Sequence, residues 1–394
     1  MNWEMYLRLC LVVFLQFAIW GSWSPVLAAR LFGPLKFTGK QVGWTYGTMY
    51  LGCIVAPLVG GLITDRWVAT QWFLAAAHLV GGVLLLAAAR QARFRSLFLV
   101  MCGYALCFAP TLPVLNSLVF RHLPKAGVSF FAVQVWGVVA WVLAGWGLTA
   151  WRKVKGTGDG SDCLKLAGGL SLLLAVYCLF LPHTPPPKEP GAVLPFIQAF
   201  GLLKNANFLI FIAVAFVVAT QLQFYFLGTA PFLGTLGVES KNMPAVMSIA
   251  QSAQVAAMVF VAFYEAEVLR ALGFRWTLAL GAAMWGLLYL VYAVGRPKGL
   301  VLASQALHGL AYAFFIGIAF IYVNQAAGDA FKASAQALLT VSLFGFGFFL
   351  GTQLTGVVMD ALKVEGRFRW RPIFLVPGLV TLAAAAALAG LFRG

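Results

Sequence analysis

Long runs of apolar residues recur along the whole chain, separated by short segments that hold most of its charged residues. Each run approaches the roughly 20 residues that a helix needs to cross the hydrocarbon core of a bilayer. The pattern therefore predicts an all-α membrane protein with about twelve transmembrane helices. We expect them near residues 5–29, 42–63, 71–89, 96–118, 128–150, 166–181, 206–229, 244–264, 276–294, 300–322, 335–359 and 373–391.

The segment 182–205 interrupts this pattern. It begins Pro-His-Thr-Pro-Pro-Pro-Lys-Glu-Pro-Gly, and so many prolines stop a helix because proline lacks an amide hydrogen and clashes with the preceding turn. We therefore expect an N-terminal six-helix bundle over 1–181, a central cytoplasmic linker over 182–205 and a C-terminal six-helix bundle over 206–394. Two matched helical halves are common among secondary transporters, which bind their solutes at the repeat interface.

Composition supports a membrane protein and excludes an ordinary soluble one. The chain is 62% hydrophobic and only 10% charged, whereas a soluble domain is about a quarter charged. A net charge of +16 in a soluble protein would suggest nucleic acid as a partner. Here the lysines and arginines lie in loops between apolar runs, so the expected partner is the lipid bilayer and no nucleic acid. The cysteines show no metal-binding or disulfide spacing, and we expect no cofactor and no metal.

The acidic residues are absent from the middle of every expected span. All eleven fall at a span end or in a loop, and a carboxylate at the centre of a spanning helix would cost about 2.5–3.5 kcal/mol on insertion scales. Many proton-driven carriers titrate a buried carboxylate. This sequence instead indicates a pathway without charged groups.

Neutral polar and aromatic residues occupy the spans instead. Gln16, Trp20 and Trp23 share one face of the first expected helix, because they are spaced by four and three residues. Amides both donate and accept hydrogen bonds, and aromatic rings stack on planar groups, so such residues suit a neutral, planar, polar solute. The substrate-binding residues that we expect are Gln16, Asn116, Gln134, Trp141, Gln223, Phe226, Gln251, Gln254, His308 and Tyr312.

Each of these residues also has a purely structural explanation. A glutamine within a span can tie two helices together, and a tryptophan more often packs or lies at the membrane interface. His308 is a candidate both for lining the pathway and for carrying a proton, because only histidine titrates near neutral pH without help.

One loop motif resembles a signature of the major facilitator superfamily. Gly61-Leu-Ile-Thr-Asp65-Arg66 ends the second expected span with an acid, where the helix dipole favours a cation. Its Gly-x-x-x-Asp-Arg spacing is similar to the segment between helices two and three of that superfamily. The resemblance implies that Asp65 and Arg66 belong to the cytoplasmic gate.

A closer resemblance is to the bacterial nucleoside/proton symporters of the same superfamily. The matching segments extend over essentially the whole chain: Phe14-Leu-Gln-Phe17, Trp20-Gly-Ser-Trp23, Leu35-Lys-Phe37, Ala109-Pro-Thr-Leu112 with Asn116, Trp136-Gly137, Leu203-Lys-Asn205 and Ala333-Ser-Ala-Gln336. This resemblance implies a major facilitator fold, a nucleoside-like small-molecule substrate moved by alternating access, and no enzyme activity. It also implies a bacterial inner-membrane location with both termini in the cytoplasm, and we expect a monomer.

The family's charged substrate contacts are replaced in this chain. By the resemblance, the arginine of the family's fifth helix corresponds to Gln134, the glutamate of the eighth to Gln254 and the aspartate of the tenth to Ala313. Gln223 and Gln251 keep two glutamines of the family. Proton coupling would therefore need another titrating group, for which His308 is the candidate, and we expect facilitated diffusion.

The remaining family positions change their side chains as well. Val138 and Trp141 stand where the fifth helix of the family has a threonine and a phenylalanine, and Phe226 replaces an asparagine of the seventh. His308 and Tyr312 stand where the tenth helix has a tyrosine and a phenylalanine.

Loop charge and family resemblance disagree about orientation. With both termini in the cytoplasm, ten basic residues lie on the cytoplasmic side and the other 17 of the 27 on the outside, against the usual excess of inner positive charge. We follow the resemblance. The alternative function is a non-transporting receptor or scaffold on the same fold, and an intramembrane enzyme is disfavoured because no nucleophile–base spacing is present.

Overall fold

The computed structural model describes residues 2–56, 60, 62–126, 130–186 and 199–393. Its contacts divide the chain into two compact units. The first comprises Met1–Phe37, Trp44–Val193 and Glu239–Ala245, and the second comprises Thr38–Gly43, Leu194–Val238 and Val246–Gly394. The division at residue 193 falls within the expected linker, much of which lies outside the described residues, and the bounds of the two expected bundles stay a prediction.

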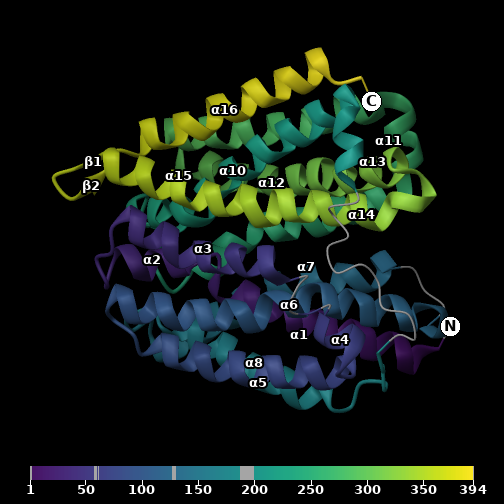
Figure 1. The fold of residues 1–394 in the computed structure, drawn as a ribbon. Helices are drawn as coiled ribbons and strands as arrows, with labels where there is room; N and C mark the ends of the chain where they lie inside the picture. The colour runs from purple at the N-terminus through teal and green to yellow at the C-terminus, as the bar shows by residue number, and fades with distance from the viewer. Residues whose placement is uncertain (1, 57–59, 61, 127–129, 187–198, 394) are drawn as a thin grey trace. The chain divides into compact units, whose positions relative to one another are not determined.

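The first unit is built almost entirely from helices (Figure 1). α5 packs along α8 and α6, and α1 packs along α7 and α8. The helices are α1 (Trp3–Trp23), α2 (Leu27–Phe32), α3 (Gly39–Ala56), α4 (Leu62–Arg66), α5 (Thr70–Ala89), α6 (Phe94–Ala126), α7 (Phe130–Lys155) and α8 (Asp162–Cys178).

The second unit is also helical, with one small hairpin of two antiparallel strands. α10 packs along α15 and α16, side by side in Figure 1. The elements are η2 (Ala199–Lys204), α10 (Ala206–Thr235), α11 (Met243–Val294), α12 (Lys298–Ala311), η3 (Tyr312–Gly317), α13 (Ile318–Ala326), α14 (Gly328–Thr340), η4 (Val341–Gly347), α15 (Phe348–Ala361), β1 (Lys363–Val364), β2 (Arg367–Phe368) and α16 (Trp370–Leu391).

The all-α membrane architecture predicted from the hydrophobic runs is confirmed. Within the described part of the chain, 10 helical segments are long and apolar enough to cross a membrane. Two expected spans lie outside this set: the one near 42–63, whose described residues up to Ala56 form α3, and the one near 166–181, where α8 has only 17 residues.

Several spans are less regular than the pattern indicated. The first expected helix ends at Trp23 and resumes at Leu27, because Pro25 in the intervening turn cannot donate a backbone hydrogen bond. The eighth and ninth spans run on as α11, whose backbone leaves helical geometry at Tyr264 and Gly273. Wider π turns interrupt two further spans, η3 between α12 and α13 and η4 between α14 and α15.

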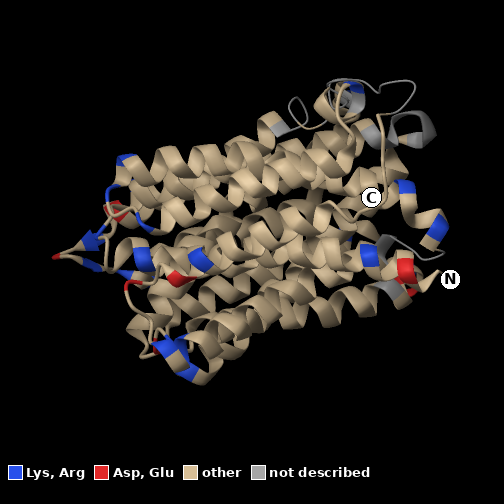
Figure 2. Cartoon of the chain, turned by 90° about the horizontal axis from the view of Figure 1, so that it is seen from below, with Lys and Arg blue, Asp and Glu red and all other residues tan. Residues whose placement is uncertain are grey.

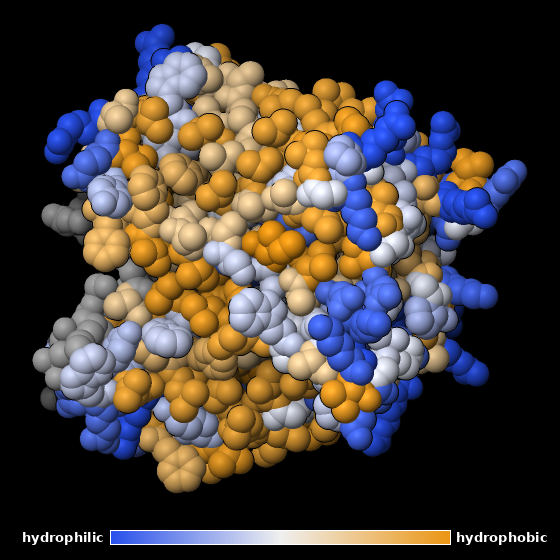
Figure 3. Space-filling model, turned by 180° about the vertical axis from the view of Figure 1, so that it is seen from behind, coloured by the Kyte–Doolittle hydropathy of each residue, from blue (hydrophilic) through white to orange (hydrophobic). Residues whose placement is uncertain are grey.

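Charge and hydropathy are distributed as a bilayer requires. In Figure 2 the charged residues lie toward the helix ends and the long middle stretches are uncharged. Large apolar side chains such as Leu99 and Phe180, both 68% exposed, point outward, and Figure 3 shows hydrophobic colours over the middle of the visible surface. Soluble monomers rarely expose such extensive apolar surface, so these faces contact lipid.

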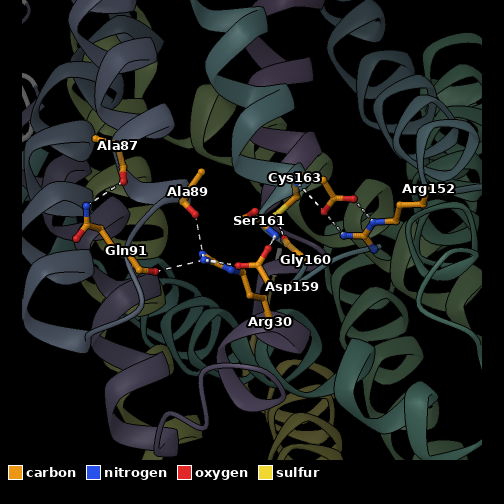
Figure 4. Close-up of polar contacts among 10 residues, drawn as sticks. Arg30, Ala87, Ala89, Gln91, Arg152, Asp159, Gly160, Ser161 and Cys163 are labelled. Carbon is orange, nitrogen blue, oxygen red and sulfur yellow. Dashed lines mark hydrogen bonds and ion pairs between the residues drawn. The ribbon is translucent and has the colours of Figure 1, made fainter. Parts of the chain in front are cut away.

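A buried arginine holds the loop between α7 and α8 (Figure 4). The side chain of Arg30 in α2 is 2% exposed and forms an ion pair with Asp159 at 3.1 Å. Its Nη2 also donates to the carbonyl oxygens of Ala89 and Gln91, at 3.1 and 3.2 Å. Gly160, with φ of 77°, lets the loop pass close to Arg30 in a left-handed conformation that favours glycine. The loop is thereby fixed to α2 and to the end of α5.

A second arginine reinforces the same loop. Arg152 of α7 donates from Nε and Nη2 to both carboxylate oxygens of Asp162, at 2.6 and 2.7 Å. This two-pronged geometry is the strong form of an arginine–carboxylate pair. Nη1 donates to the carbonyl oxygen of Ser240 at 2.9 Å, so the segment Glu239–Ala245 is held within the first unit.

The charge on Asp159 persists to low pH. Burial alone would raise its pKa, but hydrogen bonds from Ser161 and the positive charge of Arg30 lower the pKa to about 2. Because the pKa of Asp159 is lower in the folded than in the unfolded state, its charge stabilises the fold at pH values above about 4, the ordinary pKa. This stabilisation is lost as the pH falls from about 4 toward the folded-state pKa of about 2. The ion pair with Arg30 therefore remains charged at any pH near neutral.

We expect Asp159→Asn to lower the free energy of unfolding by about 1–2 kcal/mol at neutral pH, because it leaves the Arg30 charge buried without its counter-ion. The control is Glu239→Gln, which removes an exposed ion pair with Lys241 and should change stability by less than about 0.5 kcal/mol. Thermal unfolding of the purified protein in detergent measures both. Equal effects of the two substitutions would contradict the role assigned to Arg30.

Candidate functional site

In the first unit, Gln16 lies where α1 meets α6. It is fully buried, and its Nε2 donates to Thr111 Oγ1 at 2.7 Å. The Thr111 hydroxyl in turn donates to the Phe108 carbonyl oxygen at 2.6 Å. Gln16 Oε1 is buried and has no hydrogen-bond partner in the described part of the chain. One side of this amide therefore serves packing, and the other keeps an unused acceptor.

A cluster of aromatic rings lies one helical turn further along α1. Trp20 lies 5.8 Å from Trp141 of α7 and 6.2 Å from Phe108 of α6, centroid to centroid. The close approach of α1 and α7 depends on Gly21, where a Cβ atom would lie 2.9 Å from Trp141 Cα and Cγ. Trp23, expected on the same face, instead packs against other rings of the first unit and is 1% exposed, so it belongs to the core.

Two further expected residues of the first unit contact each other. Gln134 of α7 donates from Nε2 to Asn116 Oδ1 of α6 at 2.9 Å. Asn116 is exposed and Gln134 is half-buried. The pair places two side-chain amides, one from α6 and one from α7, at an accessible position away from the helix α1 that holds Gln16.

The gating residues are only partly described. Asp65 and Arg66 end α4, and the Arg66 side chain is exposed. The side chain of Asp65 lies outside the described residues, so its role as a latch stays a prediction.

In the second unit, two expected residues lie around the imidazole of a third, His308. His308 of α12 is 1% exposed. The Phe226 ring meets it edge-on at 5.9 Å and 86°, and the Tyr312 ring lies 6.0 Å away at 44°. The sequence pattern placed His308 and Tyr312 on one helix face, and the tertiary structure adds Phe226 from α10.

Two partners of His308, Tyr225 and Trp285, and the residue Gln305 that bonds Tyr225 were not expected from the sequence. Tyr225 stacks face to face on the imidazole, with centroids 3.8 Å apart and planes 17° apart, and its hydroxyl donates to Gln305 Oε1 at 3.3 Å. Trp285 of α11 donates from Nε1 to His308 Nδ1 at 3.1 Å. Gln305 precedes His308 by three residues and so shares its helix face, which was a usable signal. Nothing in the sequence pointed to Trp285.

Gln223 of α10 is buried with neither amide atom bonded. It is fully inaccessible, and its Nε2 and Oε1 have no partner among the described residues. The side chain lies against Gly351 of α15, where an added Cβ would come within 2.8 Å of Gln223 Cγ. A buried amide without partners costs about 1–3 kcal/mol, so stability does not explain why a glutamine stands here.

The two glutamines of α11 lie beside α12. Gln251 is 5% exposed, and Gln254 is half-buried with its Nε2 at 3.9 Å from Met258 Sδ. Gly309 of α12 packs directly on the backbone of α11 at Ala250 and Gln254. This close crossing fixes where α12 meets the segment of α11 that holds both glutamines.

The gathered residues carry no formal charge. None of the four ion pairs in the described part of the chain involves them. Of the acids nearest in sequence to these helices, Asp360 accepts from the backbone amides of Gly39 and Lys40, and Glu265 is half-buried at the irregular turn of α11. A multi-pass helical protein with neutral amide and aromatic clusters in its spans fits the class of membrane transporters for small uncharged solutes.

Comparisons identify the family within this class. The sequence profile described as nucleoside H+ symporter matches residues 1–394, and the chain belongs to that family. Similar proteins in Escherichia coli (strain K12) are YegT, 30% identical over 98% of this chain and 93% of its own; nucleoside permease NupG, 26% over 98% and 96%; and xanthosine permease, 29% over 94% and 91%.

A solved structure extends the comparison to the fold. The crystal structure of the nucleoside transporter NupG matches with a TM-score of 0.87 at 25% identity, covering 100% of both chains. The expected major facilitator fold is thereby confirmed. The family membership favours a transporter over the alternative of a non-transporting receptor or scaffold.

The unpaired amide of Gln223 leads to a stability test. We expect Gln223→Leu to raise the free energy of unfolding by about 1 kcal/mol, because it removes an unsatisfied buried group of similar volume. Gln305→Leu should lower it by about the same amount, since the Tyr225 hydroxyl then loses its acceptor. Thermal unfolding distinguishes the two, and destabilisation by both would refute the view that Gln223 is kept for binding.

Proposed function

We propose that this protein moves a neutral nucleoside, nucleobase or similar planar polar solute across the bacterial inner membrane by alternating access. The observation that carries the proposal is the uncharged character of the polar clusters in both units. Amide groups match the donors and acceptors on the edge of a base, and aromatic faces match its ring. Similarity to NupG and to xanthosine permease supports the same solute class.

Each of the two units would contribute its own binding groups. The first unit offers a buried amide oxygen, that of Gln16, which has no partner among the described residues. One turn further along α1 it offers the indole rings of Trp20 and Trp141. Gln223 and His308 in the second offer buried polar groups next to aromatic rings. Binding here would consist of hydrogen bonding and stacking, with no ion pair to the solute and no bond made or broken.

We further propose facilitated diffusion without strong proton coupling, as a monomer with both termini in the cytoplasm. A membrane-embedded acid is the usual proton carrier in such proteins, and all eleven acidic residues lie at span ends or in loops. The orientation rests on the resemblance to the family, whereas the loop charges favour the opposite one.

The site assignment is tested by uptake into proteoliposomes. We expect Gln251→Ala combined with Gln254→Ala to reduce saturable uptake of labelled uridine and adenosine about tenfold or more, because two hydrogen-bonding amides are lost. The matched control is Asn324→Ala with Gln325→Ala, two exposed polar residues of α13, which should leave uptake unchanged. Full uptake by the first double variant would remove these glutamines from the site.

The coupling is tested with an imposed pH gradient. For facilitated diffusion, we expect labelled nucleoside to equilibrate across the vesicle membrane and not to accumulate above the external concentration. Accumulation that a protonophore abolishes, and that is lost in His308→Phe, would instead establish proton symport through this histidine.

A further inference from the structure

The imidazole of His308 is held by uncharged groups from every element packed against it. Trp285 of α11 donates a hydrogen bond to Nδ1 at 3.1 Å. Tyr225 of α10 stacks on one face of the ring. Phe226, also of α10, meets the ring edge-on, and the ring of Tyr312 in η3 is tilted relative to it. Among the described residues, the titratable groups that contact the ring are the two tyrosines, which are neutral, and no described carboxylate or basic side chain contacts it.

The bond from Trp285 decides which ring nitrogen carries the proton. An indole nitrogen is only a donor, so His308 Nδ1 must accept and cannot hold a hydrogen. In neutral imidazole the hydrogen is then on Nε2. A second proton on Nδ1 would point at the Trp285 N–H group, break this bond and place an unpaired charge within a spanning helix.

We propose that Trp285 fixes His308 as the neutral Nε2–H tautomer, so that His308 acts as a hydrogen-bond donor to the solute and not as a proton carrier. This inference rests on the proposed function, because it assigns a role to a residue of that site. It narrows the substrate class to solutes that present an acceptor, such as a carbonyl oxygen or a ring nitrogen with a free lone pair.

Tyr225 and Gln305 act as positioning residues for this donor. The stacked Tyr225 ring, at 3.8 Å and 17°, fixes the plane of the imidazole, and Gln305 Oε1 fixes Tyr225 through its hydroxyl. With the plane and one nitrogen both fixed, the direction of the Nε2–H bond is fixed as well. The glutamine amides of the site can rotate to offer either a donor or an acceptor, whereas His308 can offer only a donor.

A site with a fixed donor rejects a solute that lacks the matching acceptor, because the donor is then buried without a partner. Loss of one such bond corresponds to about a tenfold loss of affinity. The selectivity comes from Trp285, although Trp285 itself need not touch the solute.

The tautomer is tested without any solute, by nitrogen NMR of the full-length protein labelled with ¹⁵N-histidine. His308→Phe identifies the His308 signals among those of the four histidines. We expect Nδ1 to be unprotonated, and the signals to be unchanged between about pH 5 and about 8. In Trp285→Phe, which keeps an aromatic ring but removes the N–H group, both neutral tautomers should appear. A protonated Nδ1 or a titration in the unmodified protein would overturn the proposal.

The donor role is tested by equilibrium binding of adenosine and its 1-deaza, 3-deaza and 7-deaza analogues, each lacking one acceptor nitrogen. We expect at least one analogue to bind about tenfold more weakly than adenosine, and His308→Phe to abolish that difference. His308→Gln, which keeps a neutral N–H donor, should restore part of it. An unchanged difference in His308→Phe would refute the donor role.

The two measurements separate this inference from the proposed function. If the unmodified protein binds no nucleoside and the NMR signals are as expected, the proposed substrate class is wrong and the tautomer assignment stands. If it binds nucleosides and His308 titrates, the substrate class stands and the assignment to a fixed donor is wrong.

Discussion

The structure depends on the requirement that a polar group within hydrocarbon be hydrogen-bonded inside the protein. Helices meet it for the backbone, which is why nearly every described element is a helix. Charged side chains lie at helix ends or, like Arg30 and Arg152, pair with a carboxylate, which is Asp159 of the α7–α8 loop for Arg30 and Asp162 at the start of α8 for Arg152. The amide atoms of Gln16 and Gln223 are among the buried polar atoms that have no partner in the described part of the chain, and these two glutamines are the ones that we propose for solute binding.

The same construction appears separately in the two units. In each unit a glycine lets two helices approach closely, and a buried amide lies near that crossing. Gly21 under Trp141 serves the first unit, and Gly351 against Gln223 serves the second. Small residues at helix crossings supply the packing that membrane proteins cannot obtain from the hydrophobic effect. The rigid crossing then fixes the position of the polar group beside it.

The chemistry of these clusters is neutral, although the family is named for proton symport. His308 is the residue where a proton could be expected, and its bond from Trp285 makes it a donor whose lone pair is already used. Under the proposed function, a solute would be recognised by its hydrogen-bond pattern and its flat ring. Selectivity of this kind depends on orientation more than on charge, so the residues that orient His308 matter as much as His308 itself.

Hydropathy alone determined the helical class and the approximate spans, because crossing a bilayer requires a fixed length of apolar residues. Periodicity also placed Gln16 with Trp20, and His308 with Tyr312, because residues three or four apart share a helix face. It could not indicate which helices pack together. The stack of Tyr225 on His308, the bond from Trp285 and the pairing of Arg30 with Asp159 join residues distant in sequence or on different faces. Only packing of the folded helices brings these groups together, so only the tertiary structure decided them.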